Sequence, residues 1–231
     1  MTLLQTIRQS TWWKKAEIYN DRHHDPSTGI MLSDHLNAVA AAIDRIFDDT
    51  NDPFLSALFS IFDQLGLDKE KTRFELQVVS LLHDIGKPEE EKAAMMEHPL
   101  NKELVSSRHP VLGVQAAMEI LVTDPTLSDT EKARIYHLIN EHDTPFSMYR
   151  QFQKNNIKPA FKTLKKINDK IDAEAGAGLL YLLIFKLADI DGHKTVDDVT
   201  WFFTVAKQNY YDKIGLDLPV PGESDIRMTN S

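Results

Sequence analysis

Residues 74–88 read FELQVVSLLHDIGKP, and this stretch says more about the fold than any other in the chain. Its large apolar residues recur every three or four positions, the spacing that places side chains on one face of an α-helix. The residues with this spacing are Phe74, Val78, Leu81 and Ile85. Further apolar residues fill the positions between them, so the helix is predicted to be largely buried. Gly86 and Pro88 are expected to end it.

The same helical spacing runs through most of the sequence. It predicts helices at residues 35–46, 54–65, 111–122, 131–142, 146–154, 159–171, 178–189 and 196–214. No run alternates between apolar and polar residues for long enough to predict a β-sheet. We therefore expect an all-α bundle that forms one domain over residues 1–231, with its core at about residues 33–193. Residues 216–231 contain two prolines and a glycine and are expected to be a loose tail.

The composition is typical of a soluble globular protein, since 42% of the 231 residues are hydrophobic and 26% are charged. There is no cysteine, which excludes disulfides, thiolate zinc sites and cysteine nucleophiles. The longest apolar run, at about residues 179–187, is too short to span a bilayer and contains Lys186. The N-terminal residues lack the apolar segment of a signal peptide. We expect a cytoplasmic protein that does not bind membranes.

The formal net charge of −9 argues against a basic surface that would bind long nucleic acid. One segment differs from the rest. Residues 144–168 contain no acidic residue but six basic ones: Arg150, Lys154, Lys158, Lys162, Lys165 and Lys166. Phenylalanines and a tyrosine are interleaved with them. Two interpretations remain open for this segment: a solvated helical face, or a local binding surface for a phosphorylated, aromatic substrate.

Several histidines and aspartates lie in strongly apolar contexts. His35 begins an apolar helical stripe, His142 ends another, and Asp189 directly follows the sequence LLYLLIFKLA. His83 and Asp84 end the buried helix quoted above. A buried carboxylate without a partner is costly, so it is normally paired or bound to a metal. Any one of these residues could be an ordinary core histidine or a helix cap, but together they predict one shared cation site. Imidazole and carboxylate ligands favour first-row transition metals such as iron, manganese or zinc over magnesium alone.

The order of these residues resembles the HD superfamily of metal-dependent phosphohydrolases. Its members share a histidine, an adjacent His-Asp pair and a distant aspartate, each on a different helix. The matching residues here are His35, the pair His83 and Asp84 in LLHDIGKP, and Asp189 in KLADIDGHK. The dinuclear branch has two further histidines in between, and His109 in RHPVLGVQAA and His142 in INEHD occupy those places. The similarity covers about residues 33–193, which is most of the chain.

This resemblance implies an HD-domain-like helical bundle that binds one or two divalent metals. The residues that would hold the first metal are His35, His83, Asp84 and Asp189. Asp84 would also bridge to a second metal held by His109 and His142. The metals implied are iron, manganese, nickel or zinc, with magnesium as a further candidate at one site. A water activated to hydroxide by these metals would hydrolyse a phosphomonoester or phosphodiester.

The substrate follows from a narrower similarity. LLHDIGKP followed by an ADxxG-type ending looks like the HD domain appended to bacterial tRNA nucleotidyltransferases. Members of that group hydrolyse 2′,3′-cyclic phosphates, 2′-nucleotides and related phosphoesters, so the implied substrate is a small nucleotide or an RNA end. The chain has no nucleotidyltransferase motif, which implies a stand-alone relative. It also lacks the GYP signature of cyclic di-GMP enzymes, which argues against a role of that kind.

Asp84, Lys87 and His193 are the candidate catalytic residues. Lys87 directly follows the LLHDIG stretch and has two interpretations, a phosphate contact or a charge at a helix C-terminus. His193, together with Asp191, is a candidate to donate a proton to a leaving group. Asp143 could orient His142 or a water, although an exposed turn residue is the favoured interpretation.

The candidate substrate-binding residues are cations near the ligands in the sequence: Lys87, Arg108, Arg150 and Lys154. Phosphate groups are bound by such side chains through charge-assisted hydrogen bonds. Three other histidines, at positions 23, 24 and 98, have no apolar context and are expected at the surface.

Other classes of function remain as alternatives. One is a non-catalytic HD-fold module that binds a nucleotide for signalling, although such modules usually lack a ligand and none is missing here. A purely structural helical adaptor would leave the buried Asp84 and Asp189 without a role. Among enzymes, the second choice is a nucleotidase or dinucleotide phosphohydrolase acting on small soluble substrates. The basic, aromatic segment favours a nucleotide or an RNA end over an inorganic or sugar phosphate.

Overall fold

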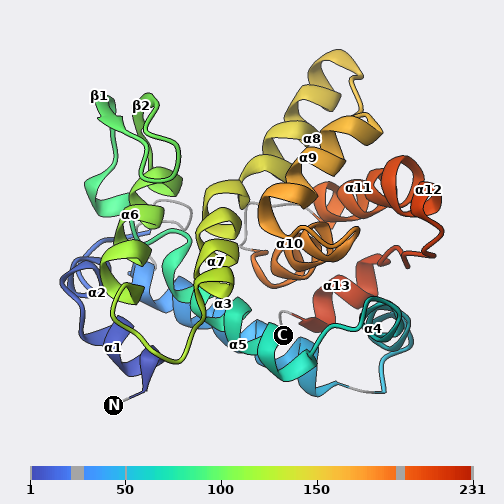
Figure 1. The fold of residues 1–231 in the computed structure, drawn as a ribbon, viewed down its shortest axis with the longest axis horizontal. Coiled ribbons are helices and arrows are strands. Elements are labelled where there is room, and N and C mark those ends of the chain that lie inside the picture. The colour runs from blue at the N-terminus through green and yellow to red at the C-terminus, as the bar shows by residue number, and fades with distance from the viewer. Residues whose placement is uncertain (1, 22–28, 50, 191–195, 230–231) are drawn as a thin grey trace.

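The computed structural model describes residues 2–21, 29–49, 51–190 and 196–229, and helices form most of this part of the chain (Figure 1). The prediction of an all-α bundle is confirmed. In chain order, the helices are α1 (Leu3–Gln9), α2 (Thr11–Ala16), α3 (Leu32–Asp48), α4 (Pro53–Leu65), α5 (Lys69–Leu82), α6 (His109–Leu121), α7 (Asp129–Glu141), α8 (Thr144–Asn155), α9 (Phe161–Ile171), α10 (Ala177–Ala188), α11 (Val196–Ala206), α12 (Asp212–Ile214) and α13 (Glu223–Thr229). A 3₁₀ turn lies at Lys87–Glu89, and a π-helical turn at Lys207–Tyr211 joins α11 to α12.

Helices begin and end where the sequence supplies caps. α4 begins after Asp52, whose side chain accepts a hydrogen bond from the Leu55 amide at 2.8 Å. It ends at Gly66, which adopts φ 64°, a conformation that glycine tolerates best. α7 begins with a capping box, in which the side chains of Ser128 and Glu131 each accept a hydrogen bond from the other residue's amide.

α10 lies at the centre of the bundle. Every residue from Ala177 to Ala188 is buried, and the helix contacts α3, α5, α7, α9 and α11. α3 also packs along α5, α5 against α7, and α7 against α6. Because α10 is surrounded by other helices, Asp189 at its C-terminal end is placed inside the molecule, where it is fully buried.

The expectation that the chain contains no sheet is wrong for one segment. β1 (Glu91–Glu97) and β2 (Leu104–Ser107) form an antiparallel hairpin that projects from the bundle beside α6 (Figure 1). β1 reads EKAAMME, which does not alternate between apolar and polar residues, and its pairing is irregular between Glu91 and Met95. A strand of this kind carries no period-two pattern, so the sequence could not indicate it.

The expectation of a loose tail at residues 216–231 is corrected over its described part. Leu218 and Ile226 are buried, and α13 packs against α3, α10 and α11. Before residue 33, Ile7 and Trp13 are buried as well. The core therefore extends beyond residues 33–193 at both ends. In the described segments, no helix is both long enough and apolar enough to span a membrane.

Candidate metal centre

The six predicted metal ligands come together from the ends of five helices. His35 lies in the first turn of α3 and His109 begins α6. The other four directly follow helices: His83 and Asp84 follow α5, His142 follows α7, and Asp189 follows α10. All six are buried. The predicted ligands therefore share one interior site, and none is left outside it.

Close backbone packing brings α6 onto the end of α5. A Cβ on Gly86 would lie 2.6 Å from Leu112 Cβ and 2.7 Å from the His109 carbonyl oxygen. A Cβ on Gly113 would lie 3.1 Å from the carbonyl oxygen of His83. Any larger side chain at either glycine would push the first turn of α6 away from the end of α5. Since these two segments carry His109, His83 and Asp84, the glycines set how close the ligands approach.

The first cluster contains His35, His83, Asp84 and Asp189. The Nε2 atoms of His35 and His83 lie 3.4 Å apart. Oδ2 of Asp84 lies 3.3 Å from His83 Nε2 and 3.7 Å from His35 Nε2. Oδ1 of Asp189 lies 3.4 Å and 3.7 Å from the same two nitrogens. Four donor atoms of the kinds that bind transition metals thus surround one point.

The second cluster contains His109, His142 and the other oxygen of Asp84. Asp84 Oδ1 lies 3.3 Å from His109 Nε2 and 3.4 Å from His142 Nε2. It is buried and makes no hydrogen bond of normal geometry to any residue that the structure describes. A buried carboxylate oxygen without such a bond calls for a cation. One carboxylate therefore serves two clusters, with one oxygen in each.

The imidazoles are held with the same nitrogen toward the centre. His83 Nδ1 lies 3.0 Å from the Ser80 carbonyl oxygen, and His142 Nδ1 lies 2.7 Å from the Ile139 carbonyl oxygen. Because a carbonyl can only accept, Nδ1 must donate, and in the neutral ring Nε2 then presents its lone pair. Backbone or carboxylate acceptors on the second ring nitrogen are typical of histidines that bind metals.

His109 differs from these two rings, because its Nδ1 faces a carboxylate without a hydrogen bond to any described residue. Its Nε2 faces Asp84, while its Nδ1 lies 3.5 Å from Oε2 of Glu90. Glu90 comes from the turn between α5 and β1, and nothing in its sequence context indicated this role. The residue is recognisable only once α6 and that turn are placed side by side.

Without a metal, the two histidines of the first cluster have very different pKa values. Burial, and then the charge of His83, lower the pKa of His35 to about 4. Burial also opposes charge on His83, but Asp84 and Asp189 outweigh it and raise the pKa of His83 to about 9. The proton that His83 retains sits between carboxylates, at the place a divalent cation would take.

The pKa values of the neighbouring groups follow from the same charges. Burial alone would raise the pKa of Asp84, but Lys87 and His83 hold it well below its usual value. The pKa of His109 is raised because Asp143 and Asp84 outweigh its burial. The pKa of Asp143 is lowered, since His142 and His109 outweigh burial.

Two groups of side chains could therefore hold metal ions: His35, His83 and Asp84, and Asp84, His109 and His142. Within each group, one ligand atom per residue lies within 4.8 Å of the others. The chain has no thiolate to offer, so the donor set is entirely imidazole and carboxylate. This set fits first-row transition metals.

Asp143 belongs to the centre, which corrects its favoured interpretation as an exposed turn residue. Its Oδ2 lies 3.1 Å from His109 Nε2, and its Oδ1 lies 3.6 Å from His142 Nε2. The side chain is 31% exposed, so it approaches the second cluster from the solvent side. Its position directly after a ligand in INEHD was the only signal in the sequence.

Two buried lysines each contact one of the ligand carboxylates. Lys186 Nζ lies 2.7 Å from Asp189 Oδ2, and Lys87 Nζ lies 2.7 Å from Asp84 Oδ2. Lys87 also lies 3.5 Å from Oδ1 of Asp21, a buried aspartate before α3. Lys186 could have been found as the one charged residue inside the apolar run of α10. Asp21 could not, because it lies far from Lys87 in the sequence.

The predicted substrate-binding cations are not all brought to the centre. Lys87 lies at the centre, where it contacts Asp84. Arg108 is 61% exposed on its side chain, with Nε 4.0 Å from Glu90 Oε1. Arg150 and Lys154 are exposed on α8, which begins directly after Asp143. At a rise of 1.5 Å per residue, they lie about 10 Å and about 16 Å along α8 from Asp143.

Of the remaining candidates, His98 is wrong as a surface residue. It is buried at the turn after β1, where its Nε2 lies 2.8 Å from Asn140 Oδ1 on α7. His193, Asp191, His23 and His24 lie outside the described residues.

Comparison with known proteins finds no family model that matches the chain and no curated protein with significant similarity to it.

Proposed function

We propose that this chain is a metal-dependent phosphohydrolase that cleaves a phosphomonoester or phosphodiester of a nucleotide or an RNA end. The observation that carries the proposal is the position of Asp84. Its two oxygens face two adjacent clusters of imidazoles, His35 with His83 and His109 with His142. A carboxylate shared in this way is the arrangement expected of a pair of cations that act on one substrate.

Six of the centre's residues would hold the metals. His35, His83 and Asp189 would bind the first with Asp84, and His109 and His142 would bind the second with the same carboxylate. Iron, manganese, nickel or zinc suit these donors best. Bound there, two divalent cations would supply Lewis acidity that lowers the pKa of a water and offsets charge on phosphoryl oxygens.

The other residues of the centre would orient these ligands and the water. Lys87 and Lys186 hold Oδ2 of Asp84 and of Asp189, which keeps the two carboxylates in their orientation. Oδ2 of Asp84 also faces the first cluster, so Lys87 contacts an oxygen that would bind the first metal. Asp143 is partly exposed beside His109 and can accept a hydrogen bond from water that enters the centre. The histidines are deeply buried, which excludes other water from between the ligands.

The choice of a phosphoester rests on the order of the ligands along the chain, which resembles the HD superfamily. The chemistry agrees with it, because a centre of this kind needs no protein nucleophile, and the chain has no cysteine to supply one. The non-catalytic alternative would not require six ligands in two adjoining clusters.

The proposal is tested by a panel of phosphoesters with the full chain loaded with manganese, iron, nickel, zinc or magnesium. The panel includes a 2′,3′-cyclic nucleotide, a 2′- and a 5′-mononucleotide, and a dinucleotide. We expect turnover of at least one of them with a transition metal, and elemental analysis should find metal bound. Metal content without turnover of any phosphoester would instead support the binding module.

Asp84→Asn gives the matched test, because it keeps the shape of the side chain but removes its charge. We expect metal content to fall and kcat to drop by about 10³-fold or more, in line with the loss of a bridging metal ligand. Glu131→Gln is the control, since it removes another buried carboxylate at the far end of α7. Equal activity of the two variants would contradict the assignment of Asp84.

A further inference from the structure

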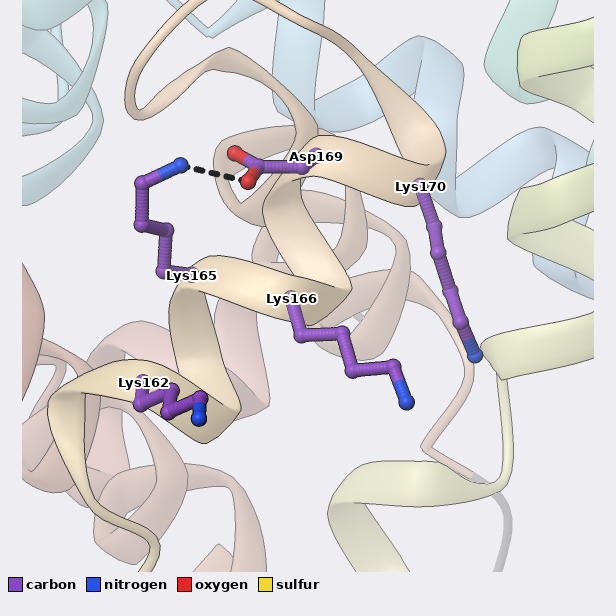
Figure 2. Close-up of a pocket in the computed structure, with 5 residues that line it drawn as sticks. All are labelled: Lys162, Lys165, Lys166, Asp169 and Lys170. Atoms are coloured by element: carbon purple, nitrogen blue, oxygen red, sulfur yellow. Dashed lines mark hydrogen bonds and ion pairs between the residues drawn. The ribbon is translucent and has the colours of Figure 1, made fainter.

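α9 carries a row of lysines on its exposed side. Lys162, Lys166 and Lys170 are four residues apart, so they follow one another along the helix. With Lys165 and Asp169 they line a shallow open depression of about 410 Å³ (Figure 2). Figure 2 shows Lys165 turned toward Asp169, while Lys166 and Lys170 extend from the other side of the helix.

The acids nearby neutralise only part of this row. Lys165 Nζ lies 2.5 Å from Asp169, and Lys170 Nζ lies 2.5 Å from Glu141. Lys162 and Lys166 have no acidic partner within 4 Å among the described residues. Like charges four residues apart on a helix repel each other and destabilise it. A chain with a net charge of −9 has acids available to relieve this, yet residues 144–168 contain none. A charge pattern that lowers the stability of a helix, with acids nearby to offset only part of it, indicates a functional role.

One ion pair connects the lysine row to the metal centre. Lys170 contacts Glu141, and Glu141 directly precedes the ligand His142. The second oxygen of Glu141 accepts a hydrogen bond from Thr144 at 2.8 Å, which fixes the junction between α7 and α8. α9 is thereby tied to the point at which the second cluster is held.

α8 begins at the same junction and carries a partly exposed aromatic ring and further cations along its length. Phe146 lies in its first turn, three residues after Asp143, and is partly exposed with the Arg150 guanidinium 5.7 Å from its ring centre. Lys154 is exposed farther along the helix. Partly exposed aromatic rings beside cations are what single-stranded nucleic acids bind, with bases stacked and phosphates paired.

We propose that Lys162 and Lys166 on α9, together with Phe146 and Arg150 on α8, bind the phosphates and a base of a short single strand of nucleic acid whose end is hydrolysed at the metal centre. This inference rests on the proposed function and names its substrate class. Lys162 lies about 12 Å along α9 from Lys170, the end of the row beside the centre, which is farther than the single phosphate of a mononucleotide reaches. The net charge elsewhere is −15, since residues 144–168 contribute +6 to the total of −9, so contact is confined to a few nucleotides.

The test is binding of a fluorescent eight-nucleotide strand to the full chain, measured by anisotropy in a chelator so that no turnover occurs. RNA and DNA strands form two arms, because both carry the same backbone phosphates. We expect either strand to bind at least tenfold tighter than a 5′-mononucleotide competitor. Lys162→Gln/Lys166→Gln should weaken strand binding about fivefold or more at 0.1 M salt. It should also reduce the slope of log affinity against log salt by about 1.4, because each phosphate contact with a single strand contributes about 0.7.

Lys69→Gln/Lys132→Gln is the matched control. It removes the same charge at the N-terminal ends of α5 and α7, whereas the ligands follow the C-terminal ends of these helices. It should bind the strand as the unmodified chain does. Equal loss in both double variants, or a mononucleotide that competes as well as the strand, would overturn the inference. Because the assay needs no metal or turnover, it can fail while the phosphoester panel succeeds, and the reverse also holds.

Discussion

Lys87 occupies a different place from the one expected of a phosphate contact. Its ammonium lies 2.7 Å from Asp84 and 3.5 Å from Asp21, and its side chain is 7% exposed. A cation held by two buried carboxylates acts on substrate through them. We therefore regard Lys87 as a positioning residue that keeps Asp84 charged and directed toward both clusters, in agreement with the low pKa of Asp84.

Lys87→Met is expected to lower the melting temperature and kcat while changing KM by less than about twofold. Removing one partner of a buried ion pair costs about 3 kcal/mol, which for a chain of this size is a fall of roughly 6–12 °C. Calorimetry and steady-state kinetics measure the two effects. Lys87→Arg keeps the charge and should recover part of both. A rise in KM with unchanged stability and metal content would instead identify a direct phosphate contact.

Single residues also show what a sequence can and cannot indicate about a site. Five of the six ligands were predictable because a charged or polar side chain in a buried apolar helix is costly unless it binds something. His109 was predicted only from the resemblance of the ligand order to the HD superfamily. Asp21, Glu90 and His98 were not predictable, because each partner lies on a segment far away in the chain. Their roles depend on tertiary contacts that no local pattern records.

At the scale of elements, helices were recognised by their spacing, and the β1–β2 hairpin was missed for a physical reason. A two-stranded hairpin is marginal in water by itself, and this one exposes Met95 and Leu104. It is held instead by its turn, where His98 contacts Asn140 two residues before the ligand His142. Its other ends lead directly to Lys87 and His109, so the hairpin connects two parts of the centre.

His98→Ala is expected to release the hairpin from α7 while the bundle stays folded. The hydrogen bond to Asn140 would be lost, and the packing of Leu100 against the core would be left to hold the turn. Amide hydrogen exchange should become at least about tenfold faster in residues 91–107 and remain unchanged in α5 and α10. Leu104→Ala changes a side chain that is 72% exposed on the same hairpin and should leave exchange as it is. Equal protection in both variants would show that the strands hold without α7.

At the scale of the whole molecule, the centre joins elements that are otherwise far apart in the sequence. α3, α5, α6, α7 and α10 each bring a ligand, so a bound cation would connect the ends of five helices. A ligand that binds only the folded chain stabilises it by mass action, by about 2.7 kcal/mol at a hundred times its dissociation constant. We expect manganese or zinc to raise the melting temperature by roughly 5–10 °C on that basis, and a chelator to reverse it.

The metal-induced rise in melting temperature should increase with pH, because the metal competes with a proton on His83. His83 has a pKa of about 9, so below that pH a metal must displace its proton, and apparent affinity should rise from pH 6.5 to 9 and then level off. The apo chain should show the opposite trend. The contribution of protonated His83 is complete below pH 6.5, its unfolded value, and is lost as pH rises through 9.

His35 adds little to this competition, because its pKa of about 4 leaves it neutral over the whole range; its own contribution to stability is lost only as pH falls from 6.5 toward 4. The metal-induced shift in melting temperature, measured by calorimetry at pH 6.5, 7.5, 8.5 and 9.5, should therefore grow steadily to about pH 9. A shift that is largest at pH 6.5 would mean that His83 carries no proton for a metal to displace. His83 would then be neutral in the apo chain, and the negative charge of Asp84 and Asp189 would not be balanced by a proton that a metal has to replace.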